Sequence, residues 1–540
     1  MHSYAPRYLN RANEAHGDVS VIDSKKLAKL RQVITENLRV QRGPNATVKY
    51  VDVANALADA CARQNHTIFA RRGCGKTLLL QTSTKHLDTS IKTVYLNCED
   101  FKRHSFPNVL IEILDALFAE LESKLNAWFG KKRRTRELIQ EIRSRLKTLR
   151  IEPDIQEQLV KSTSSTSNSD SAKLSAGIAA HGAHLSGSIG SESSLRSDVE
   201  RTFKVQQEKI RQLDLMLPEL KRQIQEFFDL SSSAQAVFLQ VDDLYHLPRA
   251  DQPFVVDYLH RLCKDVPLYF KIATLRHAST LYVDRSGQPI GAQERHDYQP
   301  INIDYSFSDF RRTRDQNRQI LLEYARLAEI EQSELDGLFK GEGFDRLVMA
   351  GGGVPRDVLS LFLEALSTAQ NQGDGRIGKD DVRILSRENF ERRIEELKQD
   401  SDGDIQDSLM RGIYVLREFC LNKATNLFVV SERLLQQNDQ IRALINRLLD
   451  YRIIHNVGSA LTHKSFPGVT FQAFVIDIGC YAHLRKLDGR FSETDVSNPE
   501  LKEKARSAAI FDLKEFNSRI ETAPADVESA LYADPTALAT

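Results

Sequence analysis

One segment, residues 66–80, constrains the fold more than any other part of the chain. A short apolar run, His66–Phe69, leads into the octapeptide ARRGCGKT at residues 70–77, and three leucines follow. Glycines at 73 and 75 let successive backbone N–H groups curve around phosphate oxygens, and a helix beginning near Lys76 adds the positive end of its dipole. The segment therefore predicts a strand, a phosphate-binding loop and a helix, in that order.

Two side chains of this loop indicate its ligand. Lys76 is spaced to reach the β- and γ-phosphates of a nucleoside triphosphate, and the Thr77 hydroxyl is spaced to bind Mg²⁺. The pattern usually begins with glycine, and Ala70 stands in that place. Because this is the position farthest from the phosphates, ATP and Mg²⁺ remain the predicted ligands.

A second apolar run ends in two carboxylates. Val237–Val241 precedes Asp242 and Asp243, and a carboxylate at the end of a buried strand holds Mg²⁺ beside the phosphates. Asp242 is therefore predicted to bind the metal together with Thr77. Asp243 stands where a general base or a water-positioning acid would lie. Many ATPases of this architecture have glutamate there, so the shorter aspartate predicts slow hydrolysis.

Two arginines are further candidates for phosphate contacts. Arg276 follows the apolar run that begins at Leu268, at the sheet edge where open α/β sheets bind ligands, and is predicted to sense the γ-phosphate. The alternative is a surface arginine that caps the strand. Arg356 follows Pro355 in the first turn of a predicted helix, where a cation is electrostatically disfavoured unless it reaches a phosphate. The alternative there is a simple helix-start turn.

The site residues predicted from these motifs form two sets. The catalytic set is Lys76, Asp242, Asp243, Arg276 and Arg356. The nucleotide-contacting set is Arg72, Gly73, Cys74, Gly75, Lys76, Thr77, Leu78 and Pro355.

Composition limits the class of protein. Lys plus Arg and Asp plus Glu both number 74, so a nucleic-acid surface can only be a local patch. Six cysteines without a CxxC pair argue against a disulfide framework or a zinc site and favour a reducing, cytoplasmic location. No apolar run approaches the roughly 20 residues that a membrane-spanning helix needs. We expect a soluble protein without a membrane partner.

Alternating apolar strands and helices predict an α/β fold with a parallel sheet. The expected domains are an N-terminal arm (1–45), a nucleotide-binding domain (46–305), a helical lid (306–398), a winged-helix domain (404–488) and a weakly ordered tail (489–540). A composition change at Gly130 marks residues 130–230 as an insertion, predicted to be a helical hairpin with a serine- and glycine-rich tip.

Two groups of basic residues are candidates for binding double-stranded DNA. The run Lys131–Arg136 opens the insertion, but glutamates interleave with its continuation, so a solvated charged helix is an equal alternative. In the winged-helix segment, Arg442 and Arg447 on the third helix and His463 and Lys464 in the wing are predicted to face a phosphate backbone. Two aspartates on that helix offset the arginines, which leaves protein binding as the alternative.

Taken together, these motifs resemble those of AAA+ ATPases. The resemblance is carried by residues 70–77, 95–98, 242–243, 274–276 and 353–356. It is strongest to the origin-recognition and initiator branch, whose members also end in a winged helix. The Asp-Asp pair and the Thr-x-Arg strand end are equally typical of STAND signalling ATPases.

The resemblance implies an α/β P-loop NTPase with a helical lid, a helical-hairpin insertion and a C-terminal winged helix. It implies a slow, Mg²⁺-dependent ATPase that acts as a nucleotide-dependent assembly switch on DNA. A homo-oligomer is expected, with an arginine of the neighbouring subunit completing each site, and Arg285 and Arg295 are the candidates. The alternative is a signalling ATPase, as in antiviral defence, that assembles with an effector protein.

Overall fold

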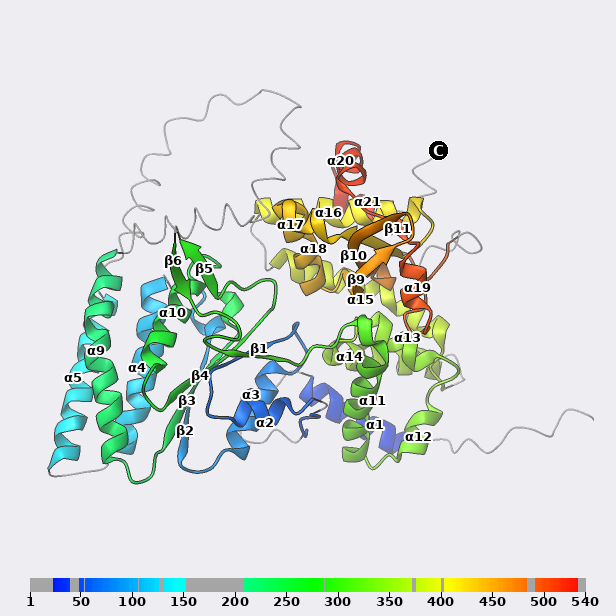
Figure 1. Ribbon diagram of the computed structural model, residues 1–540. Helices are drawn as coiled ribbons and strands as arrows, with labels where there is room; N and C mark the ends of the chain where they lie inside the picture. The colour runs from blue at the N-terminus through cyan, green and yellow to red at the C-terminus, as the bar shows by residue number, and fades with distance from the viewer. Residues whose placement is uncertain are drawn as a thin grey trace, which may run out of the picture.

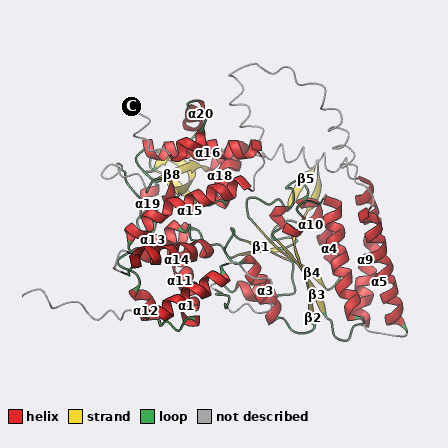
Figure 2. Cartoon of the chain, turned by 180° about the vertical axis from the view of Figure 1, so that it is seen from behind, coloured by secondary structure: helices red, strands yellow, loops and turns green. Residues whose placement is uncertain are grey.

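A computed structural model describes residues 23–38, 48–52, 54–104, 106–125, 130–151, 207–285, 287–371, 375–399, 403–482 and 491–532. The described residues form an α/β unit, a helical lid and a C-terminal unit with its own small sheet (Figures 1 and 2). The predicted serine- and glycine-rich tip of the insertion lies outside the described residues.

The first unit is built on a five-stranded parallel sheet. Its strands are β1 (His66–Phe69), β2 (Ile91–Asn97), β3 (Ala236–Asp242), β4 (Leu268–Thr274) and β7 (Gln299–Asn302), in the order β2-β3-β4-β1-β7. The apolar runs predicted as strands form β1 to β4, because a strand covered on both faces is apolar almost throughout. β7 was not predicted, since Gln299-Pro300-Ile301-Asn302 lacks such a run. The order places β1 between β4 and β7, so the loop after β1 opens beside the carboxyl ends of β3 and β4.

Helices cover both faces of this sheet. On one face, α2 (Ala56–Cys61) and α3 (Lys76–His86) pack on β1, β4 and β7. On the other face lie α4 (Phe106–Lys124) and α10 (Gln252–Cys263). Short 3₁₀ helices follow two strands directly: η1 (Cys98–Phe101) after β2 and η3 (Leu244–His246) after β3. A hairpin of β5 (Tyr282–Arg285) and β6 (Gln288–Gly291) packs beside α10.

The insertion forms the predicted pair of helices, α5 (Lys131–Ile151) and α9 (Gln207–Leu230), which stand beside α4 at the far end of the molecule from the lid (Figure 1). Their apolar side chains, including Ile142 and Leu220, belong to the same core as β3. The helices of the insertion are therefore an integral part of the first unit.

The basic side chains of α5 are largely paired within the protein. Arg143 bonds Asp115 and Glu122 of α4 at 2.8 and 2.6 Å, and Arg145 bonds Glu219 of α9 at 2.8 Å. Carboxylates of neighbouring helices thus neutralise two arginines in the continuation of the run, and within the run Arg133 pairs with Glu137 of the same helix at 2.8 Å. This favours the charged-helix interpretation of the run over a nucleic-acid surface.

The lid consists of five helices after the short η4 (Phe307–Asp309). They are α11 (Phe310–Leu327), α12 (Gln332–Gly337), α13 (Gly343–Ala350), α14 (Pro355–Asn371) and α15 (Lys379–Gln399). The helix of the predicted N-terminal arm, α1 (Ser24–Asn37), packs on the lid, with Leu30 and Ile34 fully buried. The arm is thereby tied to the lid rather than to the central sheet.

The C-terminal unit has the element order predicted for a winged helix. It runs α16 (Gly403–Asn422), β8 (Leu427–Ser431), α17 (Glu432–Gln437), α18 (Asp439–Asp450), β9 (Ile454–His463), β10 (Phe466–Ile476) and η5 (Ile478–Cys480). The strand order of its sheet is β11-β8-β10-β9. The winged-helix assignment itself stays a prediction.

The prediction of a weakly ordered tail was wrong for residues 491–532. This segment forms α19 (Leu501–Ala505), β11 (Ala509–Ile510), α20 (Leu513–Glu521) and α21 (Val527–Tyr532). β11 pairs in parallel with β8, and Phe511 and Phe516 are buried in the same core. Widely spaced apolar residues in a polar, alanine-rich stretch carry no periodic signal, and only the completed sheet provides their partners.

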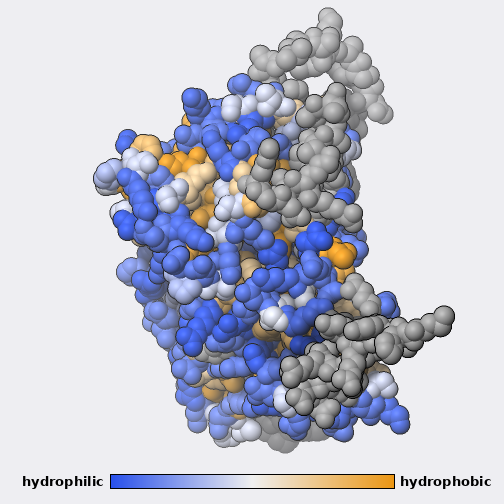
Figure 3. Space-filling model, turned by 90° about the vertical axis from the view of Figure 1, so that its right-hand side faces the viewer, coloured by the Kyte–Doolittle hydropathy of each residue, from blue (hydrophilic) through white to orange (hydrophobic). Residues whose placement is uncertain are grey.

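Among the helices of the described residues, none combines the length and apolarity needed to cross a bilayer. The face formed by the lid and the C-terminal unit is predominantly hydrophilic, with small separate apolar patches (Figure 3).

Candidate functional site

The loop after β1 has the backbone that its glycines predict. Gly73 and Gly75 adopt φ angles of 85° and 90°, which only glycine reaches without strain. A Cβ at position 73 would lie 2.8 Å from Val354 Cγ1. The Arg356 N–H donates a hydrogen bond to the Gly73 carbonyl oxygen at 3.3 Å. The loop is therefore held against the first turn of lid helix α14.

Lys76 and Thr77 begin α3 at the carboxyl edge of the sheet. The buried Lys76 Nζ donates to the carbonyl oxygens of Ala70 and Arg71 at 3.0 and 3.4 Å. Thr77 Oγ1 donates to Asp242 Oδ2 at 2.6 Å, and the Tyr95 hydroxyl donates to the same oxygen at 2.8 Å. The predicted metal ligands Thr77 and Asp242 thus meet, although they are 165 positions apart.

The donor set at this point suits Mg²⁺. Burial, reinforced by the neighbouring Asp243, raises the pKa of Asp242. A divalent cation at the Thr77 and Asp242 oxygens would supply the positive charge that favours the carboxylate form, and such oxygens are the ligands that Mg²⁺ prefers. These two residues fit the predicted metal role.

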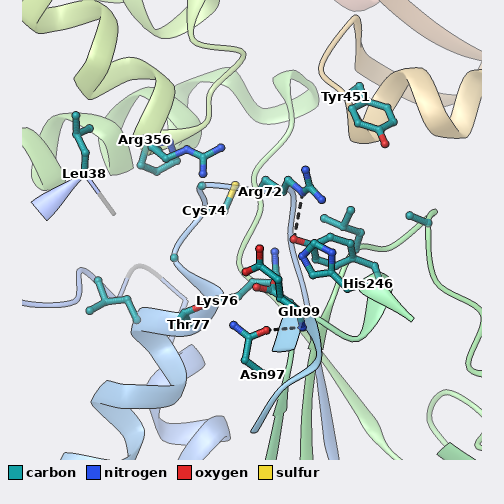
Figure 4. A pocket seen from close by; sticks show the side chains of 18 of the residues that line it. Leu38, Arg72, Cys74, Lys76, Thr77, Asn97, Glu99, His246, Arg356 and Tyr451 are labelled. Atoms are coloured by element: carbon teal, nitrogen blue, oxygen red, sulfur yellow. Dashed lines mark hydrogen bonds between the residues drawn. The ribbon is translucent and has the colours of Figure 1, made fainter. Parts of the chain in front are cut away.

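A cavity of about 1160 Å³ opens above the loop. It is large enough for a nucleotide, since ligand pockets span roughly 300–1,000 Å³. Its lining comes from the end of α1, the phosphate loop, the ends of β2 and β3, lid helices α11 and α14, and the C-terminal helices α16 and α18. Figure 4 shows Lys76, Thr77, Asn97 and Glu99 close together, with the Tyr451 hydroxyl pointing toward the pocket from α18.

The structure brings most of the predicted site residues to this cavity. All eight predicted nucleotide contacts line it, and so do Asp243 and Arg356. Asp242 lies directly behind Thr77, fully buried.

Arg276 is not among the residues that line this cavity. Its guanidinium bonds Glu294 at 2.7 Å and Asn302 at 2.8 Å and stacks on the Phe69 ring at 3.9 Å. Asn302 belongs to β7, the strand that was not predicted. The bonds to Glu294 and Asn302 hold the Arg276 side chain outside the cavity above the phosphate loop. Of the two candidate trans-acting arginines, Arg295 is exposed in a loop, and the side chain of Arg285 lies outside the described residues.

Several residues that line the cavity were not predicted. Tyr245, just beyond β3, accepts a hydrogen bond from Arg72 Nε at 3.1 Å and lies under the Arg72 guanidinium, 4.8 Å from ring centroid to Cζ. The other additions include Tyr50, Asn97, Glu99, Arg447 and Tyr451. Tyr245 and Asn97 follow predicted strands and could have been found by their position. Arg447 and Tyr451 come from another unit, and no sequence signal linked them to this cavity, since Arg447 was predicted to face DNA instead.

The parallel strand order β2-β3-β4-β1-β7, the glycine loop after β1 and the Thr77–Asp242 contact together decide the fold class. The fold is that of an α/β P-loop NTPase. Its helical additions are the α5–α9 insertion and the lid.

No protein-family model and no curated protein sequence matches the chain. Among solved structures, ORC2 of Aeropyrum pernix is 13% identical, with a TM-score of 0.36, over 88% of this chain and 97% of that one. Drosophila ORC bound to DNA is 12% identical, with a TM-score of 0.34, over 89% and 96%. Cdc6p of Pyrobaculum aerophilum is 14% identical, with a TM-score of 0.32, over 88% and 98%. These proteins belong to the branch that the motifs resemble, but the fold assignment rests on the sheet and the loop, since the TM-scores are low.

The C-terminal unit is joined to the phosphate loop by buried charged groups. The fully buried Arg452 donates from Nη1 to the Arg72 carbonyl oxygen at 3.3 Å and lies 3.3 Å from Asp357 Oδ2 of the lid. Arg71 forms a two-pronged pair with Asp304, at 2.7 and 2.8 Å, and donates to the Gly352 carbonyl oxygen at 3.0 Å. The loop, the lid and the C-terminal unit thus meet at one point.

Three of the basic side chains predicted to contact DNA have partners within the protein, and the fourth, Arg447, lines the cavity, although Lys464 stays exposed in its pair. Arg442 pairs with Asp439 at 2.6 Å, and Arg447 lines the cavity above the phosphate loop. His463 is buried with its Nε2 3.1 Å from the Ala508 carbonyl oxygen, and Lys464 pairs with Glu503 at 2.7 Å. The segment predicted as a tail supplies the partners of the last two.

Asp450, at the end of α18, makes the stability of this junction depend on pH. Burial, with the Asp304 carboxylate nearby, raises the pKa of Asp450 to about 7. Between pH of about 4 and 7, the unfolded chain has released this proton while the folded protein still holds it. The free energy of unfolding that Asp450 contributes therefore decreases over this range and is lost as the pH rises through 7.

We expect Asp450→Asn to remove this loss, because the amide does not titrate. Urea unfolding of both proteins should show the variant gaining stability relative to the wild type as the pH rises from about 4 to 7, by at most about 1.4 kcal/mol per pH unit. Parallel stability curves over this range would contradict a buried, protonated Asp450.

Proposed function

We propose that the protein binds Mg²⁺-ATP at the loop 70–77 and acts as a slowly hydrolysing, nucleotide-dependent assembly switch. The observation that supports this most directly is the Thr77–Asp242 contact at the floor of a cavity that three parts of the chain line. A ligand that contacts all three parts biases their relative arrangement. Nucleotide binding and domain arrangement are therefore coupled in this proposal.

In this proposal, different residues of the cavity bind different parts of the nucleotide. Backbone N–H groups of the loop, Lys76 and the Arg356 guanidinium would neutralise the phosphates. Apolar side chains at the cavity wall would cover the base, and they include Leu38, Val48, Tyr50, Ile320 and Leu359. Mg²⁺ held by Thr77 and Asp242 would polarise the phosphate oxygens.

Binding and assembly are tested by calorimetric titration with ATP and ADP and by native mass measurement with each nucleotide. We expect ATP to bind only with Mg²⁺ present and to increase the oligomeric mass. ATP binding without any change in mass would support nucleotide binding but contradict the proposed assembly switch.

Slow turnover is a separate prediction. Asp243 is one methylene shorter than glutamate and emerges from β3 with a left-handed φ of 54°. We expect a steady-state rate well below the enzyme median of about 10 per second, measured as phosphate release without any partner. A rate at or above that median would show that the aspartate imposes no penalty.

The partner of the assembly is double-stranded DNA or an effector protein. The pairing of Arg442, His463 and Lys464 within the chain supports the signalling alternative, in which the C-terminal unit stays closed over the nucleotide until a protein partner engages it. Titration with duplex DNA at several salt concentrations, with and without ATP, separates the two. DNA binding that weakens steeply with salt supports the assembly switch on DNA. ATP-driven assembly that is unaffected by DNA supports assembly with an effector protein.

A further inference from the structure

The side chain of Asp243 is one methylene shorter than the glutamate expected at the position of a water-activating carboxylate. β3 ends at Asp242, whose oxygens are engaged by Thr77, Tyr95 and the Asp243 N–H. Asp243 itself precedes η3 and lines the cavity. If the chain hydrolyses ATP, a longer carboxylate near this edge would compensate.

Glu99 lies just beyond the end of the neighbouring strand, β2. β2 pairs in parallel with β3, with Asn97 in register with Asp242, so both strands end at the same edge of the sheet. Glu99 is two residues beyond Asn97 in η1, and its N–H donates to Asn97 Oδ1 at 2.9 Å. This bond holds the start of η1 at the cavity, where Figure 4 shows Glu99 beside Asn97 and Lys76.

The chemistry of the lining singles out the same residue. Of the described residues that line the cavity, only Glu99 and Asp243 carry carboxylates. Burial raises the pKa of the Cys98 thiol beside Glu99, and because the two strand ends are close, the carboxylates of Asp242 and Asp243 raise this pKa further. Glu99 is exposed at its surface, where water reaches it.

We infer that Glu99 is the general base of ATP hydrolysis and that Asp243 assists it in orienting the water. The inference rests on the proposed function. The water oxygen would form a bond to the γ-phosphorus while the bond from that phosphorus to the β,γ-bridging oxygen breaks. The water proton would pass to the Glu99 carboxylate and then to solvent, and ADP and inorganic phosphate would leave.

The test compares Glu99→Gln with Asp243→Asn and with Asp100→Asn, an exposed neighbour that does not line the cavity. ATP affinity is measured by calorimetry, and hydrolysis by single-turnover phosphate release over a range of pH. We expect Glu99→Gln to lower the single-turnover rate by about 10²–10⁴-fold, the usual range for a lost general base, with ATP affinity within about threefold. Asp100→Asn should match the wild type.

The pH profile separates a base from a structural role. The wild-type rate should fall at acid pH as the base is protonated, and this limb should be absent in Glu99→Gln. Wild-type hydrolysis by Glu99→Gln, or a loss confined to Asp243→Asn, would overturn the inference and leave the ATPase proposal standing. Absence of ATP binding by the wild-type chain would overturn both.

Discussion

We expect the replacement of Lys76 with alanine to abolish measurable ATP binding and to leave the fold intact. Lys76 Nζ is buried at the floor of the cavity and donates to two loop carbonyl oxygens. In the proposed complex this charge would form charge-assisted hydrogen bonds to the phosphates that no neighbouring residue of α3 could replace. We expect the dissociation constant to rise at least about 100-fold, which corresponds to about 2.7 kcal/mol.

The matched control is Lys85→Ala, an exposed lysine in the last turn of the same helix. Calorimetric titration with Mg²⁺-ATP should leave this variant within about twofold of the wild type, and thermal unfolding should place both variants close to the wild type. Unchanged ATP affinity in Lys76→Ala would refute the phosphate-loop assignment. A large drop in its melting temperature would instead show that the buried lysine is needed for folding.

Replacing Arg393 with alanine has the largest expected effect on stability. Arg393 is buried in α15 and donates to Asp477 Oδ2 at 2.5 Å, to the Arg452 carbonyl oxygen at 3.0 Å and to the Ala350 carbonyl oxygen at 2.7 Å. Burial opposes ionisation of Asp477, but Arg393 and His455 hold its pKa below the usual range. Truncating the arginine leaves a buried carboxylate without its main counter-charge, so we expect a loss of about 3–5 kcal/mol in the free energy of unfolding.

The neighbouring residue supplies the control. Arg392 forms a two-pronged pair with Glu364, and nearly half of its side chain is exposed. Removal of an exposed pair costs at most about 1 kcal/mol, so Arg392→Ala should stay near the wild type in urea unfolding. Equal effects of the two substitutions would contradict the idea that buried charge pairing joins the lid to the C-terminal unit.

The sequence predicted those features whose causes lie within a few neighbouring residues. Gly73 and Gly75 meet a backbone requirement of the loop, and the uninterrupted apolar runs of β3 and β4 reflect burial on both faces of a sheet. The start of α14 at Pro355 likewise follows from the local geometry of proline. For these reasons the backbone of the loop after β1, the strand that ends at Asp242 and the order of elements in the C-terminal unit could be predicted directly.

Other features depend on contacts between distant segments. Arg276 was placed correctly at a strand end, but its direction is set by Glu294 and by Asn302 of β7. The basic residues of α5 were recognised as a run with its continuation, yet the partners of Arg143 and Arg145 are on α4 and α9. A charge run in the sequence does not reveal which carboxylates will face it after folding.

The sequence by itself determined the glycine loop after β1 and the apolar strand that ends at Asp242, and the spacing of glycine, lysine, threonine and carboxylate along these two segments predicts a nucleotide site. Only the tertiary structure decided what surrounds that site. Arg452 bonds the Arg72 carbonyl oxygen although the two residues are 380 positions apart. This bond and the position of Tyr451 at the cavity both depend on the packing of the end of α18 against the loop. The burial of Asp450, Arg393 and Asp477 is a property of that packed junction, and no local pattern encodes the free energy of a contact between segments so far apart.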